Sequence, residues 1–171
     1  MSKITREEYL SLRQKFEPEN TRLVIIAESP PASGLYFYNP RGHLSEPLFT
    51  ALMRQLGYSP GTKEDGLREF QRRGWLLVDA TYEPVNTREV NRDNVIARDY
   101  PQLVNDLKSL IADRLTPLIL IKANVCRILG PKLEAEGFNV LNCGRAIYFP
   151  STGRQKEFQK QFAEILRSTE I

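Results

Sequence analysis

The sequence predicts an α/β fold, a three-layer α/β/α sandwich around a central, mainly parallel sheet of four strands. Two observations support this prediction: four short apolar runs rich in β-branched residues recur along the chain, and helical patterns separate them. Strands that are apolar at nearly every position are expected to be covered by helices on both faces. The chain has 171 residues, within the usual length of one domain, so residues 1–171 are interpreted as a single domain.

The four strands are expected at residues 22–27 (RLVIIA), 75–80 (WLLVDA), 117–122 (PLILIK) and 138–142 (FNVLN). Each run is short, apolar and bounded by polar residues, glycine or proline, which is the pattern of a buried strand.

The first two helices have readable ends. Thr5 and Glu8 form a capping-box pattern at the start of an N-terminal amphipathic segment. Ser45 is a candidate cap for a second helix, which would take Pro47 in its first turn and stop at Gly57.

The remaining helices are expected between and after the later strands. One spans 63–73 and ends before a glycine, and another is capped by Asp99 and runs to about residue 115. Asn124 opens a short helix that Gly130-Pro131 is expected to halt, because proline removes a backbone donor. The last helix is expected over 155–167.

Ligands of open parallel sheets bind beyond the carboxyl ends of the strands, so the loops that follow the strands are the candidate site. The loop after the first strand, ESPPASGLYFYNPRGH, combines a carboxylate, a hydroxyl, two prolines and three aromatic residues. Pro30 and Pro31 stiffen the backbone where it leaves the sheet, and Gly34 permits a close approach. The aromatic residues 36–38 offer stacking faces or, in the alternative interpretation, fill the core.

The loop before the last helix, YFPSTGRQKEF, places a hydroxyl pair, a glycine and Arg154 at a helix start. Free backbone N–H groups and the positive end of the helix dipole attract phosphate there, and the guanidinium matches a phosphate oxygen. The alternative is simple capping of the helix by Ser151 or Thr152.

These stretches, in this order, resemble the motifs of the uracil-DNA glycosylase superfamily. AESPP is similar to the motif that ends the first strand, GLYFYN to the stacking segment, WLLVDA to the base-reading strand, and FPSTGRQKEF to the loop before the last helix. The resemblance implies that Phe37 stacks on an extruded base and that Asp79 lies where the family reads the edge of uracil. It implies DNA contacts for a further set of loop residues: Pro30, Pro31, Ser151, Thr152, Gly153 and Arg154.

The same resemblance exposes departures. Ser29 replaces the aspartate that positions water in the best-known members, and Phe149 replaces a histidine. Glu28 is then the substitute acid, provided that the Pro30-Pro31 turn aims it at the pocket. A carboxylate at Asp79 only accepts hydrogen bonds unless it is protonated, which leaves the preferred base open. Pro31, where some members have a tyrosine that excludes thymine, leaves room for larger bases.

The resemblance implies a DNA-repair glycosylase that hydrolyses the N-glycosidic bond of uracil or another deaminated base. The alternative is a non-catalytic binder of damaged, abasic or single-stranded DNA, which the replacements at positions 29 and 149 favour. A small-molecule enzyme unrelated to DNA is a third possibility. A net charge of +3 permits a polyanionic partner without requiring one. Five cations are expected to share the rim of the site: Arg41, Arg88, Arg92, Lys122 and Arg154.

Further expectations are negative or general. No cofactor or metal is implied, because no phosphate-binding glycine motif and no metal-ligand spacing occurs. The two cysteines, in a chain without a recognisable signal peptide, are expected to be reduced thiols. The protein is expected to be cytoplasmic and monomeric. No apolar run is long enough for a membrane span. His43 is either a solvated loop residue or a group at the pocket mouth.

Overall fold

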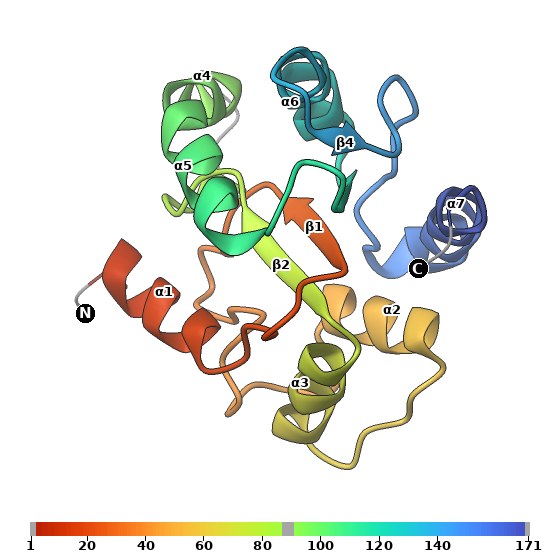
Figure 1. Ribbon diagram of the computed structural model, residues 1–171. Coiled ribbons are helices and arrows are strands. Elements are labelled where there is room, and N and C mark those ends of the chain that lie inside the picture. Colours follow the sequence, from red (N-terminus) through yellow and green to blue (C-terminus); the bar gives the residue numbers. More distant parts are fainter. Residues whose placement is uncertain (1–2, 87–90, 170–171) are drawn as a thin grey trace.

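The computed structural model describes residues 3–86 and 91–169. Within them the chain folds as an α/β domain with a four-stranded, all-parallel sheet in the order β2-β1-β3-β4, flanked by helices (Figure 1). The elements in chain order are α1 (Arg6–Gln14), β1 (Leu23–Ala27), α2 (Pro47–Leu56), α3 (Lys63–Arg72), β2 (Trp75–Asp79), α4 (Arg92–Arg98), α5 (Tyr100–Leu110), β3 (Pro117–Leu120), α6 (Ala123–Ala135), β4 (Asn139–Val140), the 3-10 turn η1 (Thr152–Arg154) and α7 (Gln155–Arg167).

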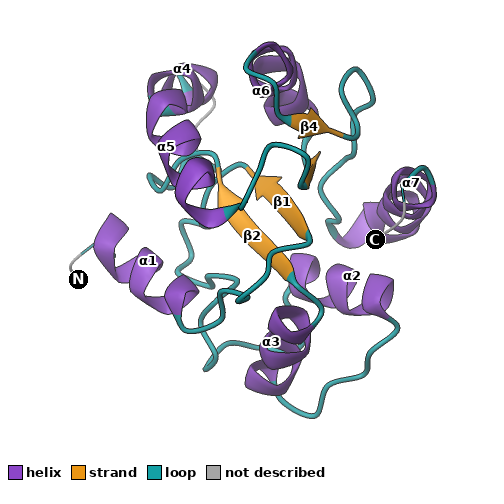
Figure 2. Ribbon diagram, viewed as in Figure 1, coloured by secondary structure: helices purple, strands orange, loops and turns teal. Residues whose placement is uncertain are grey.

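The central strands of the sheet are fully buried. All five residues of β1 and all five of β2 are buried, which explains why both segments are apolar without alternation. β1 pairs with β2 from Leu23 opposite Trp75 to Ala27 opposite Asp79, so both strands end at the same rim. The long loops that follow them therefore start side by side (Figure 2).

Most of the predicted helix ends are confirmed. Thr5 and Glu8 form the capping box of α1, Gly57 ends α2 in a left-handed conformation at φ 66°, and α7 spans the predicted residues. The expected side-chain caps at Ser45 and Asp99 are wrong. Glu46 is the residue before α2, and the Asp99 carboxylate accepts from Thr81 and Arg98 instead of from the start of α5.

The prediction that Gly130-Pro131 halts a helix is also wrong. α6 continues to Ala135 with Pro131 inside it, although an interior proline costs about 3 kcal/mol. The side chains of Val125, Leu129 and Leu133 are fully buried along one face of this helix. Burial of that face outweighs the lost hydrogen bond.

Two further boundaries differ from expectation. A helix that the sequence did not predict, α4, lies between β2 and the helix expected after Asp99, and its Val95 and Ile96 are buried. The last strand is only two residues long. Beyond it, the side chain of Asn142 makes the hydrogen bonds to β3 that strand backbone would otherwise make. Its amide accepts from the backbone N of Leu120 at 2.9 Å and donates to the Leu120 carbonyl at 2.8 Å.

The aromatic segment after β1 packs into the core. Tyr36, Phe37 and Tyr38 are 2%, 6% and 0% exposed, so these side chains fill the core, as the alternative interpretation predicts. Tyr38 lies against the sheet, where its hydroxyl accepts a hydrogen bond from the backbone N of Leu77 at 2.8 Å. The segment thus holds the loop against β2 and the helices below it.

Candidate functional site

A cavity of about 360 Å³ opens at the carboxyl ends of β1 and β2. Its volume lies in the usual range for small-ligand sites, and most of its wall is apolar. The loop after β1, the start of α2, the end of β2 and Phe149 enclose it. Six residues predicted for the site line this cavity: Glu28, Ser29, Pro30, Pro31, Phe37 and Asp79.

Asp79 places a buried carboxyl in the wall of this cavity. The residue is 4% exposed, and its Oδ2 atom has no hydrogen-bond partner among the described residues. Burial raises the pKa of the Asp79 carboxyl to about 8, whereas the nearby Arg13 guanidinium lowers it and Glu28 raises it. The side chain is therefore largely neutral at pH 7, and a neutral carboxyl offers both a donor and an acceptor.

Tyr36 supplies a second unpaired polar atom in the same wall. Its hydroxyl is buried and has no partner in the described part of the chain. Burial, with the nearby Tyr82 and Asp79, raises the pKa of Tyr36 well above its ordinary value, so the hydroxyl stays protonated. Buried unpaired polar atoms are rare in folded proteins, and the two residues that carry these atoms, Asp79 and Tyr36, both line this cavity.

Phe37 lines the cavity but is held by other aromatic rings. Its ring centroid lies 4.9 Å from Tyr38, 5.2 Å from Phe70 and 6.1 Å from Phe49. Such edge-to-face contacts fix the ring in place. Stacking of Phe37 on a base stays a prediction, and any such contact would use only the small part of the ring that the cavity exposes.

Glu28 is a fully occupied carboxylate. Its Oε1 atom accepts from Lys122 Nζ at 2.6 Å and from Arg92, and its Oε2 atom accepts from Asn124 at 2.7 Å and from Arg92 Nε at 3.0 Å. Burial raises the pKa of Glu28, but these donors outweigh burial and hold the pKa below its ordinary value. Glu28 lines the cavity as an ionised group with several donors.

The stiff loop beyond Glu28 is tied to the loop after β2. The backbone N of Val85 donates to Ser29 Oγ at 3.3 Å, and the backbone N of Ala32 donates to Asn86 Oδ1 at 2.9 Å. These bonds bridge the two longest loops of the rim. Pro30 and Pro31 lie between them in the cavity wall.

A second hollow, of about 530 Å³, adjoins the cavity and shares Lys122 and Phe149 with it. We call it the cationic groove, because Arg92, Lys122 and Arg154 line it against a single carboxylate, Asp93. Asp93 is itself paired with Arg127 at 2.8 Å. The groove therefore presents a net positive wall to an anionic ligand.

The last loop contributes to the groove in part. Ser151 and Arg154 line it, whereas Thr152 and Gly153 are exposed outside it. The side chain of Ser151 makes no cap hydrogen bond with η1, so the alternative of simple capping is not what the structure shows for this residue. Arg154 pairs with Glu157 at 3.0 Å and lies over the Tyr148 ring at 4.4 Å.

The expected basic rim is only partly assembled. Arg92, Lys122 and Arg154 meet in the groove, but Arg41 lines neither hollow and Arg88 lies outside the described residues. His43 is exposed and lines neither of them.

Several residues of the site were not predicted from the sequence. Lys63 and Glu46 form a buried ion pair at 2.7 Å, with Glu46 in the cavity wall. Asn86 also lines the cavity, and Asn124 helps to hold Glu28. The only signal in the sequence was the position of Asn86 and Asn124 after predicted strands, whereas nothing local distinguishes Lys63 or Glu46 from surface charges.

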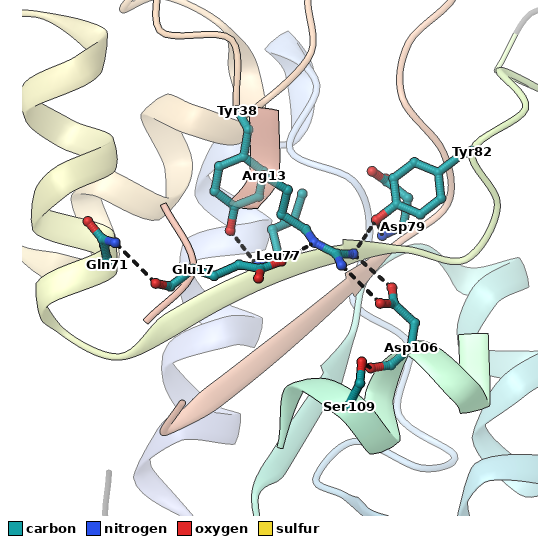
Figure 3. Close-up of polar contacts among 9 residues, drawn as sticks. All are labelled: Arg13, Glu17, Tyr38, Gln71, Leu77, Asp79, Tyr82, Asp106 and Ser109. Carbon is teal, nitrogen blue, oxygen red and sulfur yellow. Dashed lines mark hydrogen bonds and ion pairs between the residues drawn. The ribbon is translucent and has the colours of Figure 1, made fainter. Parts of the chain in front are cut away.

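A polar cluster supports Asp79 from behind (Figure 3). The Arg13 guanidinium donates to the Tyr82 hydroxyl at 2.8 Å and to both carboxylate oxygens of Asp106, at 2.7 and 2.9 Å. The same Tyr82 hydroxyl accepts a long hydrogen bond, 3.4 Å, from the backbone N of Asp79. The end of β2 is thereby tied to α1 and α5.

No protein-family model matches the chain, and a search of curated proteins finds no match either. Among the described residues, no group of three or more histidine, cysteine, aspartate or glutamate side chains is placed to hold a metal ion. In the same residues, no helix has the length and apolar character needed to cross a membrane.

Proposed function

We propose that this chain is a DNA-repair glycosylase, similar to the uracil-DNA glycosylase superfamily, which hydrolyses the N-glycosidic bond of uracil or another deaminated base. Its sheet and helices would form the three-layer α/β/α sandwich of that superfamily. DNA as the substrate would place the activity inside the cell, with the protein acting as a monomer.

The observation that carries the proposal is the junction of two chemically different hollows. The cavity has apolar walls with the unpaired atoms of Asp79 and Tyr36, which suits a flat base with polar edges. The adjoining cationic groove suits a phosphate. A nucleotide turned out of a DNA strand has these two parts at the spacing of one sugar.

Catalysis by such a site would rest mainly on charge. The departing base carries negative charge in the transition state, and the protonated Asp79 can donate a hydrogen bond to it. Glu28 lines the cavity beside Lys122, where its negative charge would favour positive charge on the sugar, and it can orient water in exchange for one of its present donors. Its four hydrogen bonds keep it ionised and in place.

One observation favours the second candidate function, a non-catalytic binder of damaged, abasic or single-stranded DNA. Both oxygens of Glu28 are engaged by Arg92, Lys122 and Asn124, and its pKa is lowered, so it is a weak proton acceptor. A binder would need the same cavity and groove without a base.

Single-turnover cleavage of duplexes that carry uracil, hypoxanthine or xanthine tests the proposal. We expect excision of at least one of these bases. Glu28→Gln should slow the single-turnover rate of excision by about 10²-fold or more, which is the scale of a positioned acid–base group. Glu64→Gln, at an exposed position on α3, is the matched control and should leave the rate unchanged.

The outcomes separate the candidates. Tight binding of an abasic duplex without excision of any base would establish the binder and reject the glycosylase. An unchanged rate in Glu28→Gln, with excision intact, would remove Glu28 from the mechanism.

A further inference from the structure

Lys122 lies at the point where the two hollows of the site meet. It lines both the cavity and the cationic groove, a position that it shares only with Phe149 among the described residues. Of the two, Lys122 alone carries a reactive group. Its side chain is 28% exposed, so part of it is open to the two hollows.

This junction is where the sugar of a bound nucleotide has to pass. If the base occupies the cavity and a phosphate occupies the groove, as the proposed function requires, the C1′ atom lies between them. The Lys122 amine is then adjacent to the carbon that becomes an aldehyde once the base is lost. The inference therefore rests on the proposed function, because that function places the base in the cavity and the phosphate in the groove.

The surroundings of the amine hold it in place. Lys122 Nζ donates to Glu28 Oε1 at 2.6 Å, and Arg92 and Asn124 hold Glu28 from other directions. The ionised carboxylate therefore fixes the position of the amine at the junction of the two hollows.

The backbone of Lys122 is unusual for a lysine. It has φ 86° and ψ 137°, a conformation that glycine adopts readily and other residues rarely do. Its N–H donates to the Ile147 carbonyl at 2.7 Å, and its carbonyl accepts from Cys126 in the first turn of α6. Strain of this kind is concentrated at functional sites, where the surrounding structure maintains it. An arginine or lysine that only neutralised a phosphate would not need this strained backbone conformation.

We propose that Lys122 is the nucleophile of an abasic-site lyase activity. The ammonium loses a proton to solvent water, and the neutral amine attacks C1′ of the ring-opened abasic site. Loss of water from the carbinolamine leaves an imine between Nζ and C1′. Water then accepts the C2′ proton, the C2′–H electron pair forms the C2′–C3′ double bond, and the C3′–O bond breaks. The 3′ strand leaves with its 5′-phosphate, and hydrolysis of the imine restores the amine.

Borohydride trapping on a duplex with one preformed abasic site tests this proposal independently of base excision. Sodium borohydride reduces an imine to a stable amine, so the wild-type protein should become covalently joined to the DNA. Mass spectrometry of the digested adduct should place the link on Lys122. Without borohydride, the same duplex should be incised on the 3′ side of the abasic site.

Lys122→Arg keeps the positive charge and cannot form the imine. We expect it to bind the abasic duplex nearly as well as the parent, with loss of both the adduct and the incision. Lys108→Arg, at an exposed position on α5, should keep both. A melting curve for each variant shows whether it is folded, and the adduct mapped on the wild-type protein does not depend on any variant.

Each other result counts against the proposal. An adduct that persists in Lys122→Arg or maps to another amine, or no adduct from wild-type protein that binds the abasic duplex, overturns the lyase alone. Excision from a uracil duplex, read after alkali treatment, then still reports on the glycosylase. Failure to bind abasic DNA at all would overturn both.

Discussion

Asp79 shows how surroundings set the chemistry of a residue. The side chain ends a buried strand, faces a mostly apolar cavity and has an unpaired oxygen, and these conditions favour its neutral form. In the unfolded chain the same carboxyl ionises at its ordinary value of 3.8, whereas in the folded protein it ionises at about 8. Stability therefore depends on pH through this residue.

We predict that Asp79→Asn stabilises the protein progressively as the pH rises from about 4 to about 8. Below pH 4 the carboxyl is protonated in both states of the wild-type protein and contributes no pH dependence. Between the two pKa values only the unfolded state ionises, so the free energy of unfolding of the wild type falls relative to that of the variant. Urea denaturation at several pH values measures the difference, which should level off above pH 8. A difference that is constant from pH 4 to pH 8 would show that the carboxyl is not buried in its neutral form.

At the scale of elements, the last loop and the start of α7 determine how the groove binds anions. Arg154 is the last residue of η1 and lies over the Tyr148 ring, with Glu157 as its partner one turn along the helix. The pair with Glu157 is exposed on both sides and contributes little to stability. The guanidinium can therefore exchange this partner for a phosphate at small cost.

We predict that Arg154→Ala weakens binding to abasic DNA of any sequence and lowers the slope of log K against log salt by about one, because one fewer counterion is released. Binding titrations at several salt concentrations measure this slope. Arg167→Ala, at the exposed far end of the same helix, is the control and should keep the parent slope. An unchanged slope for Arg154→Ala together with reduced stability would make Arg154 a packing residue.

At the scale of the whole molecule, the site depends on a connection that crosses the domain. Arg13 on α1 is 3% exposed and joins Asp106 on α5 through two hydrogen bonds, and one of the same two nitrogens also donates to the Tyr82 hydroxyl. Since Tyr82 contacts the backbone of Asp79, the N-terminal helix supports the floor of the cavity. Helices distant in sequence thereby fix the end of β2.

We predict that Arg13→Met lowers the free energy of unfolding by about 3–5 kcal/mol, because it leaves the Asp106 carboxylate buried without its partner. Removal of both charges in Arg13→Met with Asp106→Leu should recover a large part of this loss. Urea denaturation compares the three proteins at one pH. A loss below about 1 kcal/mol for Arg13→Met would place the pair in the class of weak surface ion pairs.

The sequence by itself determined the class of fold and the loops that form the site. Four apolar runs bounded by polar residues predicted the strands, because burial on both faces demands apolar residues at successive positions. The carboxyl ends of parallel strands lie at one rim, so the positions of Glu28 and Asp79 at two strand ends predicted that they lie near each other, and both line one cavity.

Only the tertiary structure decided the charge state and the partners of these residues. Burial makes Asp79 neutral, and donors from α4 and the start of α6 keep Glu28 ionised, although local sequence treats both as ordinary acids. Packing also carried α6 past Pro131 and placed Lys122 where the cavity meets the groove. Local sequence patterns reflect secondary-structure propensity and polarity. The pKa values, the helix ends and the shared cavity depend instead on which distant side chains exclude water or donate hydrogen bonds.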